Sequence, residues 1–326
     1  MPKTIRARFA TALVGVTALL ALPAAAEEIS VTHWGALMYG SPYAVAMEKG
    51  LFKQAGIDIT GILTSQGGGT TMRNVLSGGL PYGEVALSAV IAAINEGIDL
   101  KIVNSGVRTV ADILWVTMPD SNIKTIKDVV GTKLAYTSPK SVTDMLSIMC
   151  LETAGIPYTK VDRAALGSMG SGLTALEKGA VNTAAIAEPL WSGRKDKYRA
   201  VFYSKDMLPP MTQTVGVTTA EFIKSSPQKL RAIIAGRRAG VDYVFAHPDE
   251  AADILAKAYT SLKPEVAKIA VKDLVAAGYW SRGDFDIKGM NEFTRGLKII
   301  GEVKGDVAWE KIIDRSFLPA DLRGSS

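Results

Sequence analysis

Two stretches of this chain carry the same order of glycine, proline and polar residues, and this repeat limits the fold more than any other feature. Gly56 and Gly68 are twelve residues apart, and so are Gly155 and Gly167. The other matches are Ser41-Pro42 with Ser138-Pro139, Ala55-Gly56-Ile57 with Ala154-Gly155-Ile156, and the nine-residue intervals Gly79 to Ser88 and Gly179 to Glu188. Four matches in the same order predict two similarly built units.

Within each unit, the residue pattern predicts strands that alternate with helices. Residues 28–33 alternate as a strand, residues 43–47 give a helix with an apolar face that Gly50 can end, and residues 57–63 form a second strand. Residues 85–87 are expected to be a short buried strand with Ser88 at its end. Strand and helix in alternation predict an α/β fold with two lobes.

Two apolar stretches, residues 113–117 and 213–218, are expected to connect the lobes. A second connection makes the first lobe discontinuous. We therefore expect residues 27–115 and 215–326 in lobe 1, and residues 116–214 in lobe 2. The helical patterns that begin at Pro227, Pro248 and Pro264 are expected to pack on lobe 1, because proline suits a first helical turn.

The glycine-rich stretch Ser65-Gln66-Gly67-Gly68-Gly69-Thr70-Thr71 precedes a short helical pattern at residues 72–76. Glycine permits positive φ and close approach of the backbone, and a helix N-terminus attracts negative charge. One interpretation is a cradle for a small polar or anionic group, and the other is a flexible loop before an N-capped helix. Nucleotide motifs do not fit, since no Gly-Lys-Ser/Thr sequence follows.

The repeat gives this stretch a counterpart at residues 167–172. Ligands of open α/β sheets bind beyond the carboxyl ends of the strands, so residues at these ends in both units are expected to line one cleft. The candidates are His33, Trp34, Gly68, Gly69 and Ser88 from one unit, and Thr137, Ser138, Gly167, Ser168 and Glu188 from the other.

The candidate residues have two interpretations each. Trp34 and Tyr39 wall off a ligand or pack in the interior. The hydroxyls of Ser41, Thr70, Thr71 and Ser141 contact a ligand or cap helices, and Ser141 and Asp144 have capping-box spacing. His33 bonds the ligand or is structural. A carboxylate at Glu188 favours a ligand with an amine, amidine or ring N–H and opposes a simple anion, unless Arg108 offsets it.

The N-terminal segment has the layout of a secretory signal peptide. Three basic residues, Lys3, Arg6 and Arg8, precede a thirteen-residue apolar run and the small residues Ala24-Ala25-Ala26. The run is shorter than the roughly 20 residues of a membrane-spanning helix. We expect residues 1–26 to be a signal peptide cleaved near Ala26. Its removal takes the formal charge from +5 to +2, which gives no support for nucleic-acid binding.

Disulfide and metal chemistry receive no support from the sequence. Cys150 is the only cysteine, and its apolar helical surroundings predict a core residue. His33 and His247 are far apart and lack metal-ligand spacing.

Four stretches carry a resemblance to a known family. They are SPYAVAMEKGLF at residues 41–52, GGGTT at 67–71, TSPKS at 137–141 and AIAEP at 185–189. Over roughly residues 29 to 315, the chain resembles the periplasmic substrate-binding proteins of ABC importers, in the nitrate/sulfonate/taurine and thiamine-precursor (SsuA/THI5-like, NMT1-like) group.

The resemblance implies a periplasmic binding protein-like II fold, with a mixed sheet flanked by helices in each lobe and two crossover strands. It implies a monomeric, periplasmic binding protein without a cofactor rather than an enzyme. Such a protein closes by hinge motion around a small polar organic molecule or anion and delivers it to a permease and ATPase in the inner membrane. Sulfonate, nitrate, pyrimidine, amine and aromatic acid all stay open as ligands.

Two alternatives stay open as well. Yeast pyrimidine-precursor synthases share this fold family and use pyridoxal phosphate with a lysine, a histidine and a cysteine-rich motif. The single cysteine and the export signal argue against that enzyme. The second alternative is a ligand-sensing partner of a membrane receptor, which sequence alone does not separate from a transport protein.

Overall fold

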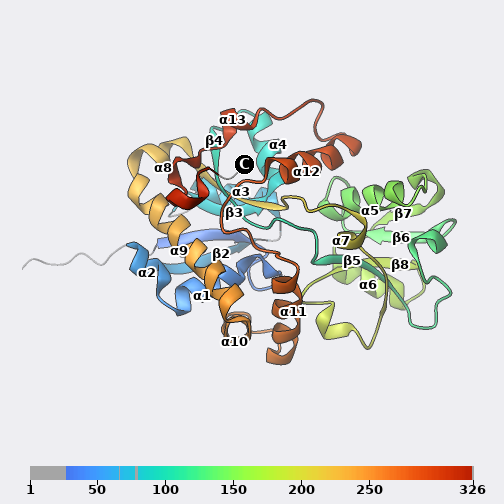
Figure 1. The fold of residues 1–326 in the computed structure, drawn as a ribbon. Helices are drawn as coiled ribbons and strands as arrows, with labels where there is room; N and C mark the ends of the chain where they lie inside the picture. Colours follow the sequence, from blue (N-terminus) through green and yellow to red (C-terminus); the bar gives the residue numbers. More distant parts are fainter. Residues whose placement is uncertain (1–26, 66, 78–79, 325–326) are drawn as a thin grey trace, which may run out of the picture.

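The computed structural model describes residues 27–65, 67–77 and 80–324. Their strands form two five-stranded sheets, each surrounded by helices (Figure 1). This arrangement confirms the predicted α/β class with two mixed sheets. The predicted signal peptide at residues 1–26 lies outside the described residues. None of the helices in the described ranges is long and apolar enough to cross a membrane.

The first sheet combines strands from the two ends of the chain. In pairing order, its strands are β2 (Ile59–Ser65), β1 (Glu27–Thr32), β3 (Tyr82–Ala86), β10 (Thr214–Thr219) and β4 (Leu100–Ser105). β1 is parallel to β2 and β3, whereas β10 is antiparallel to β3 and β4. The sheet is therefore mixed, and β10 is its only strand from beyond residue 105 in the described chain.

The second sheet has the same arrangement but is built from one continuous stretch. In pairing order, its strands are β7 (Asp162–Ala165), β6 (Lys133–Tyr136), β8 (Thr183–Ala187), β5 (Ile113–Thr117) and β9 (Arg199–Tyr203). β6 is parallel to β7 and β8, and β5 is antiparallel to β8 and β9. The equal order and direction of strands confirm the internal repeat.

Burial explains which segments are inner strands. All five residues of β8 and all five of β5 are buried, which is why each segment is apolar except for one threonine at one end. Trp115 of β5 stacks on Phe202 of β9 with ring centroids 5.0 Å apart. By contrast, the edge strand β7 has no buried residue.

The chain passes from the first sheet to the second between Ser105 and Ile113, and returns between Tyr203 and Thr214. The two connecting segments are hydrogen-bonded to each other. Gly106 N donates to Thr214 O at 2.8 Å, and Gln213 N donates to Val107 O at 2.8 Å. They form one short two-stranded connection between the sheets.

Helices cover both sheets. Those that follow strands of the first sheet are α1 (Ser41–Glu48), α2 (Leu51–Ala55), α3 (Gly68–Ser77) and α4 (Leu87–Asn95), and those within the second stretch are α5 (Val142–Thr153), α6 (Met169–Glu177) and α7 (Ser204–Met207). The C-terminal helices are α8 (Ala220–Ser225), α9 (Pro227–Ala246), α10 (Pro248–Ala258), α11 (Pro264–Ala276), α12 (Ile287–Ile299) and α13 (Trp309–Ile312).

The C-terminal helices do not pack on the first sheet alone. α9 and α10 lie against α1, as expected, but α12 contacts α5 and α11 contacts the turn at Ser192–Arg194 (Figure 1). Gly296 permits the α12–α5 contact, because a Cβ there would lie 2.5 Å from the sulfur atoms of Met145 and Met149. Helices α11 and α12 therefore bridge the two halves, which the helical pattern alone did not predict.

A buried ion pair fastens α9 to the first sheet. Arg237 Nε donates to Glu84 Oε2 at 2.8 Å, and Thr214 Oγ1 donates to Glu84 Oε1 at 2.8 Å. The remaining Arg237 nitrogens donate to the carbonyls of Ser281 and Gly106 at 2.9 and 3.0 Å. Every charged group is thus hydrogen-bonded, as burial of charge requires, and α9 is tied to the connection between the sheets.

Three predicted element boundaries need correction. The glycine-rich stretch is not a loop before a helix at Met72, because α3 already begins at Gly68. The strand expected at residues 85–87 ends at Ala86, so Ser88 lies in the first turn of α4. Ser41 is the first residue of α1 rather than its N-cap, and its hydroxyl donates to Met38 O at 3.0 Å.

Candidate functional site

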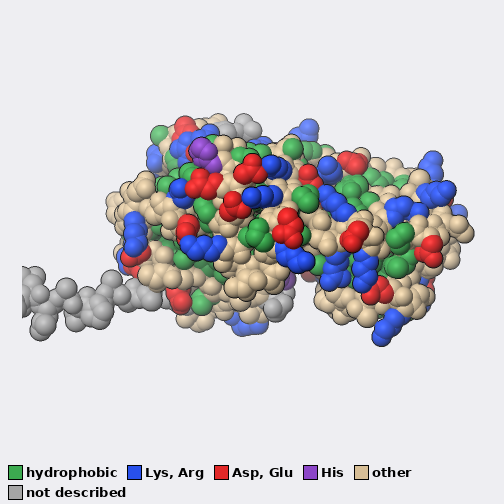
Figure 2. Space-filling model, turned by 90° about the horizontal axis from the view of Figure 1, so that it is seen from below, with side chains coloured by type: hydrophobic (Ala, Val, Ile, Leu, Met, Phe, Trp, Pro, Cys, Tyr) green, Lys and Arg blue, Asp and Glu red, His purple; other side chains and the backbone are tan. Residues whose placement is uncertain are grey.

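A cavity of about 1330 Å³ lies between the two halves of the molecule. Three parts of the chain line it: the end of β1 with the starts of α3 and α4, the corresponding ends in the second sheet, and the segment from Tyr259 to Ile269 at α11. Figure 2 shows the molecule hollowed between its halves, with Lys, Arg and His side chains at the edge. The volume exceeds the roughly 300–1,000 Å³ of a typical small-ligand pocket.

The N-termini of four helices meet at this cavity. Their first turns and the residues just before them line it, namely Gly67 and Gly68 at α3, Ser88 and Ala89 at α4, Ser141, Val142 and Thr143 at α5, and Ser168 and Met169 at α6. The N–H groups of a first turn have no partner within the helix, and the helix dipole adds a partial positive charge there. Four such ends around one space favour a negatively charged group.

Hydroxyl groups cluster at the α5 end of the cavity. Thr137 Oγ1 lies 2.9 Å from Ser141 Oγ and 2.8 Å from Thr143 Oγ1. Ser141 Oγ also accepts from Asp144 N at 3.1 Å, which confirms its expected N-cap role. Ser168 caps α6 in the same way, accepting from Ser171 N at 3.1 Å.

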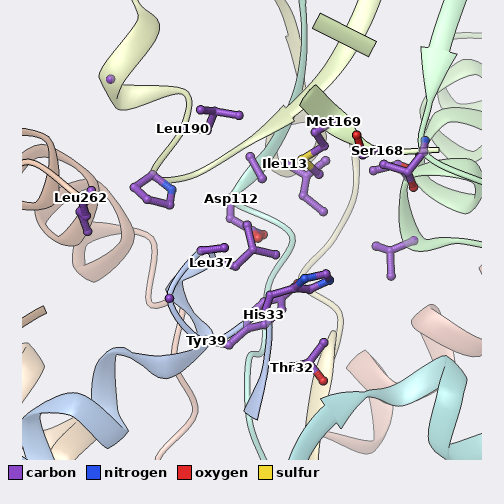
Figure 3. A pocket seen from close by; sticks show the side chains of 18 of the residues that line it. Thr32, His33, Leu37, Tyr39, Asp112, Ile113, Ser168, Met169, Leu190 and Leu262 are labelled. Carbon is purple, nitrogen blue, oxygen red and sulfur yellow. Dashed lines mark hydrogen bonds between the residues drawn. The ribbon is translucent and has the colours of Figure 1, made fainter. Parts of the chain in front are cut away.

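His33 lies at the end of β1 and lines the cavity (Figure 3). Its φ of 55° is in the left-handed region, which non-glycine residues rarely adopt and which clusters at functional sites. Burial lowers the pKa of the imidazole, so His33 is neutral at pH 7. A neutral imidazole can both donate and accept a hydrogen bond.

A hydrogen-bonded group of polar side chains, Asp112, Tyr39 and Gln213, lies at the inner end of the cavity. Gln213 Nε2 donates to Asp112 Oδ1 at 2.9 Å, and the Tyr39 hydroxyl donates to Gln213 Oε1. Asp112 and Tyr39 both line the cavity. Burial raises the pKa of Asp112 to about 6 and that of Tyr39 well above its usual value.

Sequence reasoning missed Asp112 and Gln213. A signal existed, because Asp112 is the single charge in the apolar run Val110-Ala111-Asp112-Ile113-Leu114.

Four basic side chains line the outer part of the cavity: Lys140, Arg194, Lys195 and Lys263. Two of them form ion pairs with acidic side chains from the C-terminal part of the chain. Lys140 pairs with Glu302 at 2.7 Å, and Lys195 pairs with Asp273 at 3.1 Å. Both ion pairs are solvent-exposed, so each contributes little stability.

Apolar side chains complete the wall. Leu37, Ile113, Met169, Leu190 and Leu262 surround the polar centre in Figure 3. The cavity therefore fits a ligand that combines an anionic group with an apolar part.

Nine of the predicted ligand residues line this one cavity. They are His33, Tyr39, Gly68, Ser88, Thr137, Ser138, Ser141, Gly167 and Ser168. Their contact with a ligand stays a prediction.

The other six predicted ligand residues are not among the cavity-lining residues: Trp34, Ser41, Gly69, Thr70, Thr71 and Glu188. The Trp34 ring packs edge-on against Tyr259, with centroids 5.1 Å apart. The Thr71 hydroxyl is buried and bonded to Thr32 Oγ1 at 2.7 Å, and Thr70 Oγ1 accepts from Arg73 at 2.8 Å.

Glu188 has a structural partner in place of a ligand. Its carboxylate is buried and accepts from Ser192 N and Ser192 Oγ, both at 3.1 Å. Burial raises the pKa of Glu188, and the bonds to Ser192 counteract part of that shift. The argument from Glu188 against an anionic ligand therefore loses its basis. Arg108, the residue considered as its offset, pairs with Asp284 at 3.7 Å.

Comparison with known proteins gives one family and a set of similar folds. The family model described as NMT1/THI5 like matches residues 38–251. No curated protein matches the sequence significantly.

Three solved structures illustrate the similarity of fold. The aliphatic sulphonate binding protein SsuA from Escherichia coli has a TM-score of 0.73 and 17% identity, over 89% of this chain and 92% of that one. The alkanesulfonate-binding protein SsuA from Xanthomonas axonopodis pv. citri, bound to MOPS, has a TM-score of 0.71 and 14% identity, over 90% of this chain and 100% of that one. The nitrate-binding protein NrtA from Synechocystis PCC 6803 has a TM-score of 0.67 and 15% identity, over 93% of this chain and 92% of that one. At these identities the likeness shows a periplasmic binding protein fold.

Proposed function

The chain belongs to the NMT1/THI5-like family, and from that premise we propose that it is the solute-binding component of an ABC-type uptake system. In this proposal the cavity between the sheets captures a small organic anion. The protein then delivers the anion to a permease and its ATPase in the inner membrane. The predicted signal peptide supports a periplasmic location.

The observation that carries the proposal is the meeting of four helix N-termini at one cavity. First-turn residues of α3, α4, α5 and α6 all line it, and hydroxyls of Thr137, Ser141 and Thr143 lie beside them. Each end offers N–H groups and a partial positive charge to an oxyanion. The basic side chains at the outer part add long-range attraction for anions.

The apolar wall supports an organic ligand over a bare inorganic ion. Leu37, Met169 and Leu262 can cover the carbon part of a ligand. The similar solved structures support a negatively charged ligand, since they are described as proteins that bind sulfonates, in one case with MOPS bound, and nitrate.

Ligand capture is proposed to close the cleft. The cavity is wide, and its walls belong to two sheets joined by the paired segments at residues 105–113 and 203–214. A ligand that contacts both walls stabilises a closed arrangement by its differential affinity for that state. We propose the predicted lobes, residues 27–115 with 215–326 and residues 116–214, as the two moving bodies, with boundaries shifted by a few residues because β5 belongs wholly to the second sheet and β10 wholly to the first.

The decisive test places a fixed negative charge at one helix N-terminus. Ser88→Asp puts a carboxylate in the first turn of α4, where it would occupy the anion position and repel a ligand anion. Ser77→Asp, at the exposed end of α3, is the matched control. We expect calorimetry to show binding of alkanesulfonates or carboxylates to the wild type and to Ser77→Asp, and its loss in Ser88→Asp.

Two results would argue for other functions. Equal anion binding by Ser88→Asp and the wild type would remove the helix N-termini from the proposed site. An absorbance band of a protein-bound aldimine after addition of pyridoxal phosphate would favour the enzyme alternative instead.

A further inference from the structure

His33 is one of two residues at the cavity that have an unusual backbone conformation. Among the described residues, only His33 and Lys140 are non-glycine residues with positive φ, at 55° and 67°. Both line the cavity, and they follow strands that hold the same place in their sheets, β1 and β6. Such a conformation is uncommon and concentrates at functional sites. Each half of the molecule therefore presents one strained residue to the cavity.

The left-handed backbone of His33 is held by three hydrogen bonds. His33 N donates to Ser65 O at 3.0 Å, and His33 O accepts from Ala36 N and Leu37 N, both at 3.0 Å. Glycine would adopt this φ without strain, so the backbone alone gives no reason for a histidine at this position. What this residue adds over glycine is its imidazole, which extends into the cavity (Figure 3).

The imidazole of His33 has no partner within the described protein. It is half-buried, and within residues 27–65, 67–77 and 80–324 it forms no hydrogen bond or ion pair. By contrast, the hydroxyls of Tyr39, Thr137 and Ser141 at the same cavity are all hydrogen-bonded to protein groups. The ring nitrogens of His33 are thus available to a ligand.

His33 lies beside the N-terminus of α3, one of the four helix ends at the cavity. The Ser65 carbonyl that accepts from His33 N comes three residues before Gly68, where α3 begins. The preceding residue, Thr32, is bonded to the first turn of the same helix through Thr71 Oγ1 at 2.7 Å. An anion at this helix end would therefore lie close to the imidazole.

No charged group of the protein sets the ionisation of His33. Glu27 and Glu28 lie at the opposite end of β1, and the basic side chains of the outer cavity, like Asp196 and Glu265, line other parts of it. The titratable or charged side chains on the elements around His33 are Tyr39, Arg73, Glu84, Asp112 and Tyr259. Burial is the single cause of the lowered pKa of His33, and none of these charges contributes.

We propose that His33 contacts the bound anion and takes up a proton from solvent as the anion binds, so that the protein captures its ligand more tightly at acidic than at alkaline pH. This inference rests on the proposed function, because it assumes an anion in the cavity. In the free protein, burial lowers the pKa and favours the neutral imidazole. An anion in contact raises that pKa, because an opposite charge nearby favours the charged form. Anion binding and protonation then strengthen each other.

The test uses propanesulfonate, benzenesulfonate and nitrate, whose own charge stays constant between about pH 5 and about pH 8, the range in which a histidine titrates. Calorimetry in two buffers of different ionisation enthalpy gives the dissociation constant and the number of protons taken up. We expect at least one probe to bind the wild type with net proton uptake. Its affinity should be about tenfold or more greater at the acidic end of the range than at the alkaline end.

His33→Asn removes the titratable group and suits the backbone. Asparagine tolerates the left-handed region, and its amide still donates a hydrogen bond. We expect this variant to bind the probe without the proton uptake and with little dependence on pH. His247→Asn is the matched control, because His247 is the only other histidine, is exposed and does not line the cavity. It should behave as the wild type does.

Asp112 is the second group at the cavity that titrates in this range, because burial raises its pKa to about 6. The same calorimetry on Asp112→Asn separates the two groups. Proton uptake that persists in Asp112→Asn and disappears in His33→Asn supports the inference. Proton uptake that disappears in Asp112→Asn and persists in His33→Asn would overturn it, and the proposed function would stand.

A second readout keeps the inference testable even if His33→Asn folds poorly. The chain has two histidines, so its imidazole NMR signals are few, and His247→Asn assigns them. We expect the pKa of His33 to lie below its usual value in the free protein and to rise on saturation with a bound probe. An unchanged pKa with a probe bound would overturn the inference alone. If none of the three probes binds at any pH, anion capture itself is contradicted, and the inference fails with it.

Discussion

A Cβ atom placed on Gly68 would lie only 2.3 Å from the Cβ of Ala89. Gly68 begins α3 and Ala89 lies in the first turn of α4, so the missing side chain lets two helix N-termini approach each other at the cavity. Neither Gly68 nor Gly69 is among the glycines with positive φ. The glycine at 68 is thus required for close packing and not for a left-handed backbone.

This contact predicts opposite effects for neighbouring glycines. Gly68→Ala should lower the free energy of unfolding by about 1–3 kcal/mol, because the two Cβ atoms cannot occupy that space without a shift of a helix. Gly69→Ala has nothing within 4 Å of its new Cβ and should be neutral or stabilising by up to about 1 kcal/mol. Chemical denaturation of the two variants checks this. Equal stability of Gly68→Ala and Gly69→Ala would contradict this account, because it would mean that α4 shifts to make room for the new Cβ at no cost.

The buried pair Glu84–Arg237 should be sensitive to loss of one partner. Arg237→Met leaves an unpaired carboxylate among Tyr43, Tyr82 and Thr214, and we expect a loss of about 3–5 kcal/mol. The double variant Glu84→Gln/Arg237→Met should recover part of that loss. Denaturation of the single and double variants gives the coupling energy, and a double variant no more stable than Arg237→Met would contradict the account.

Asp112 should make stability depend on pH. The folded state keeps the proton up to about pH 6, whereas the unfolded chain releases it near 3.8. The folded state therefore binds more protons in this range, and the contribution of Asp112 to the free energy of unfolding falls as the pH rises from about 4 to about 6. The total is on the order of 3 kcal/mol.

The comparison that isolates this effect is the stability difference between the wild type and Asp112→Asn, measured by denaturation across that pH range. The difference should change with pH for Asp112→Asn and stay constant for Asp120→Asn. Parallel curves for all three proteins would mean that Asp112 titrates normally in the folded state.

The basic side chains at the outer cavity should act on the rate of ligand capture. Lys140→Gln and Lys195→Gln each remove one positive charge. The side chain of Lys140 is 65% exposed and that of Lys195 is 40% exposed. We expect slower association of an anion and a weaker dependence of that rate on salt, with little change in dissociation. Stopped-flow binding at several salt concentrations tests this, with Lys53→Gln, an exposed lysine of α2 that does not line the cavity, as control. A change confined to dissociation would place the lysines in direct ligand contact.

Much of the architecture was readable from spacing alone. The twelve-residue and nine-residue intervals predicted two equal units, and the two sheets share one strand order with β5 and β10 in matching places. The sequence of strands and helices along the chain is readable because glycines and prolines mark where elements end, whereas the pairing order within each sheet was not predicted. The positions of α11 and α12, which bridge the two halves, could not be predicted. An amphipathic pattern shows that one face of a helix is buried but not which element covers it.

The site was only partly predictable for a similar reason. The sequence intervals match Ser88 with Glu188, but the sheets match Ala86 with Ala187 as strand ends, so Glu188 directly follows β8 and bonds Ser192 while Ser88 lies one residue further, in α4, and lines the cavity. A shift of one residue after a strand sends a side chain to a different side of the chain, and equal sequence intervals do not reveal such a shift. Asp112 and Gln213 were missed because they lie on the connections between the units, outside the repeat that guided the search.

The place of β10 between β3 and β4 also sets an order for folding. The second sheet consists of residues 113–203 and is complete once that stretch is available, whereas the first sheet lacks its fourth strand, and Glu84 lacks Arg237, until the chain beyond residue 237 is present. Pairings distant in sequence form slowly. In a chain that emerges from its N-terminus, all strands of the second sheet are therefore present before those of the first. Until β10 is available, the strands within residues 27–105 form an incomplete sheet with an open edge, a surface prone to wrong pairing that chaperones protect.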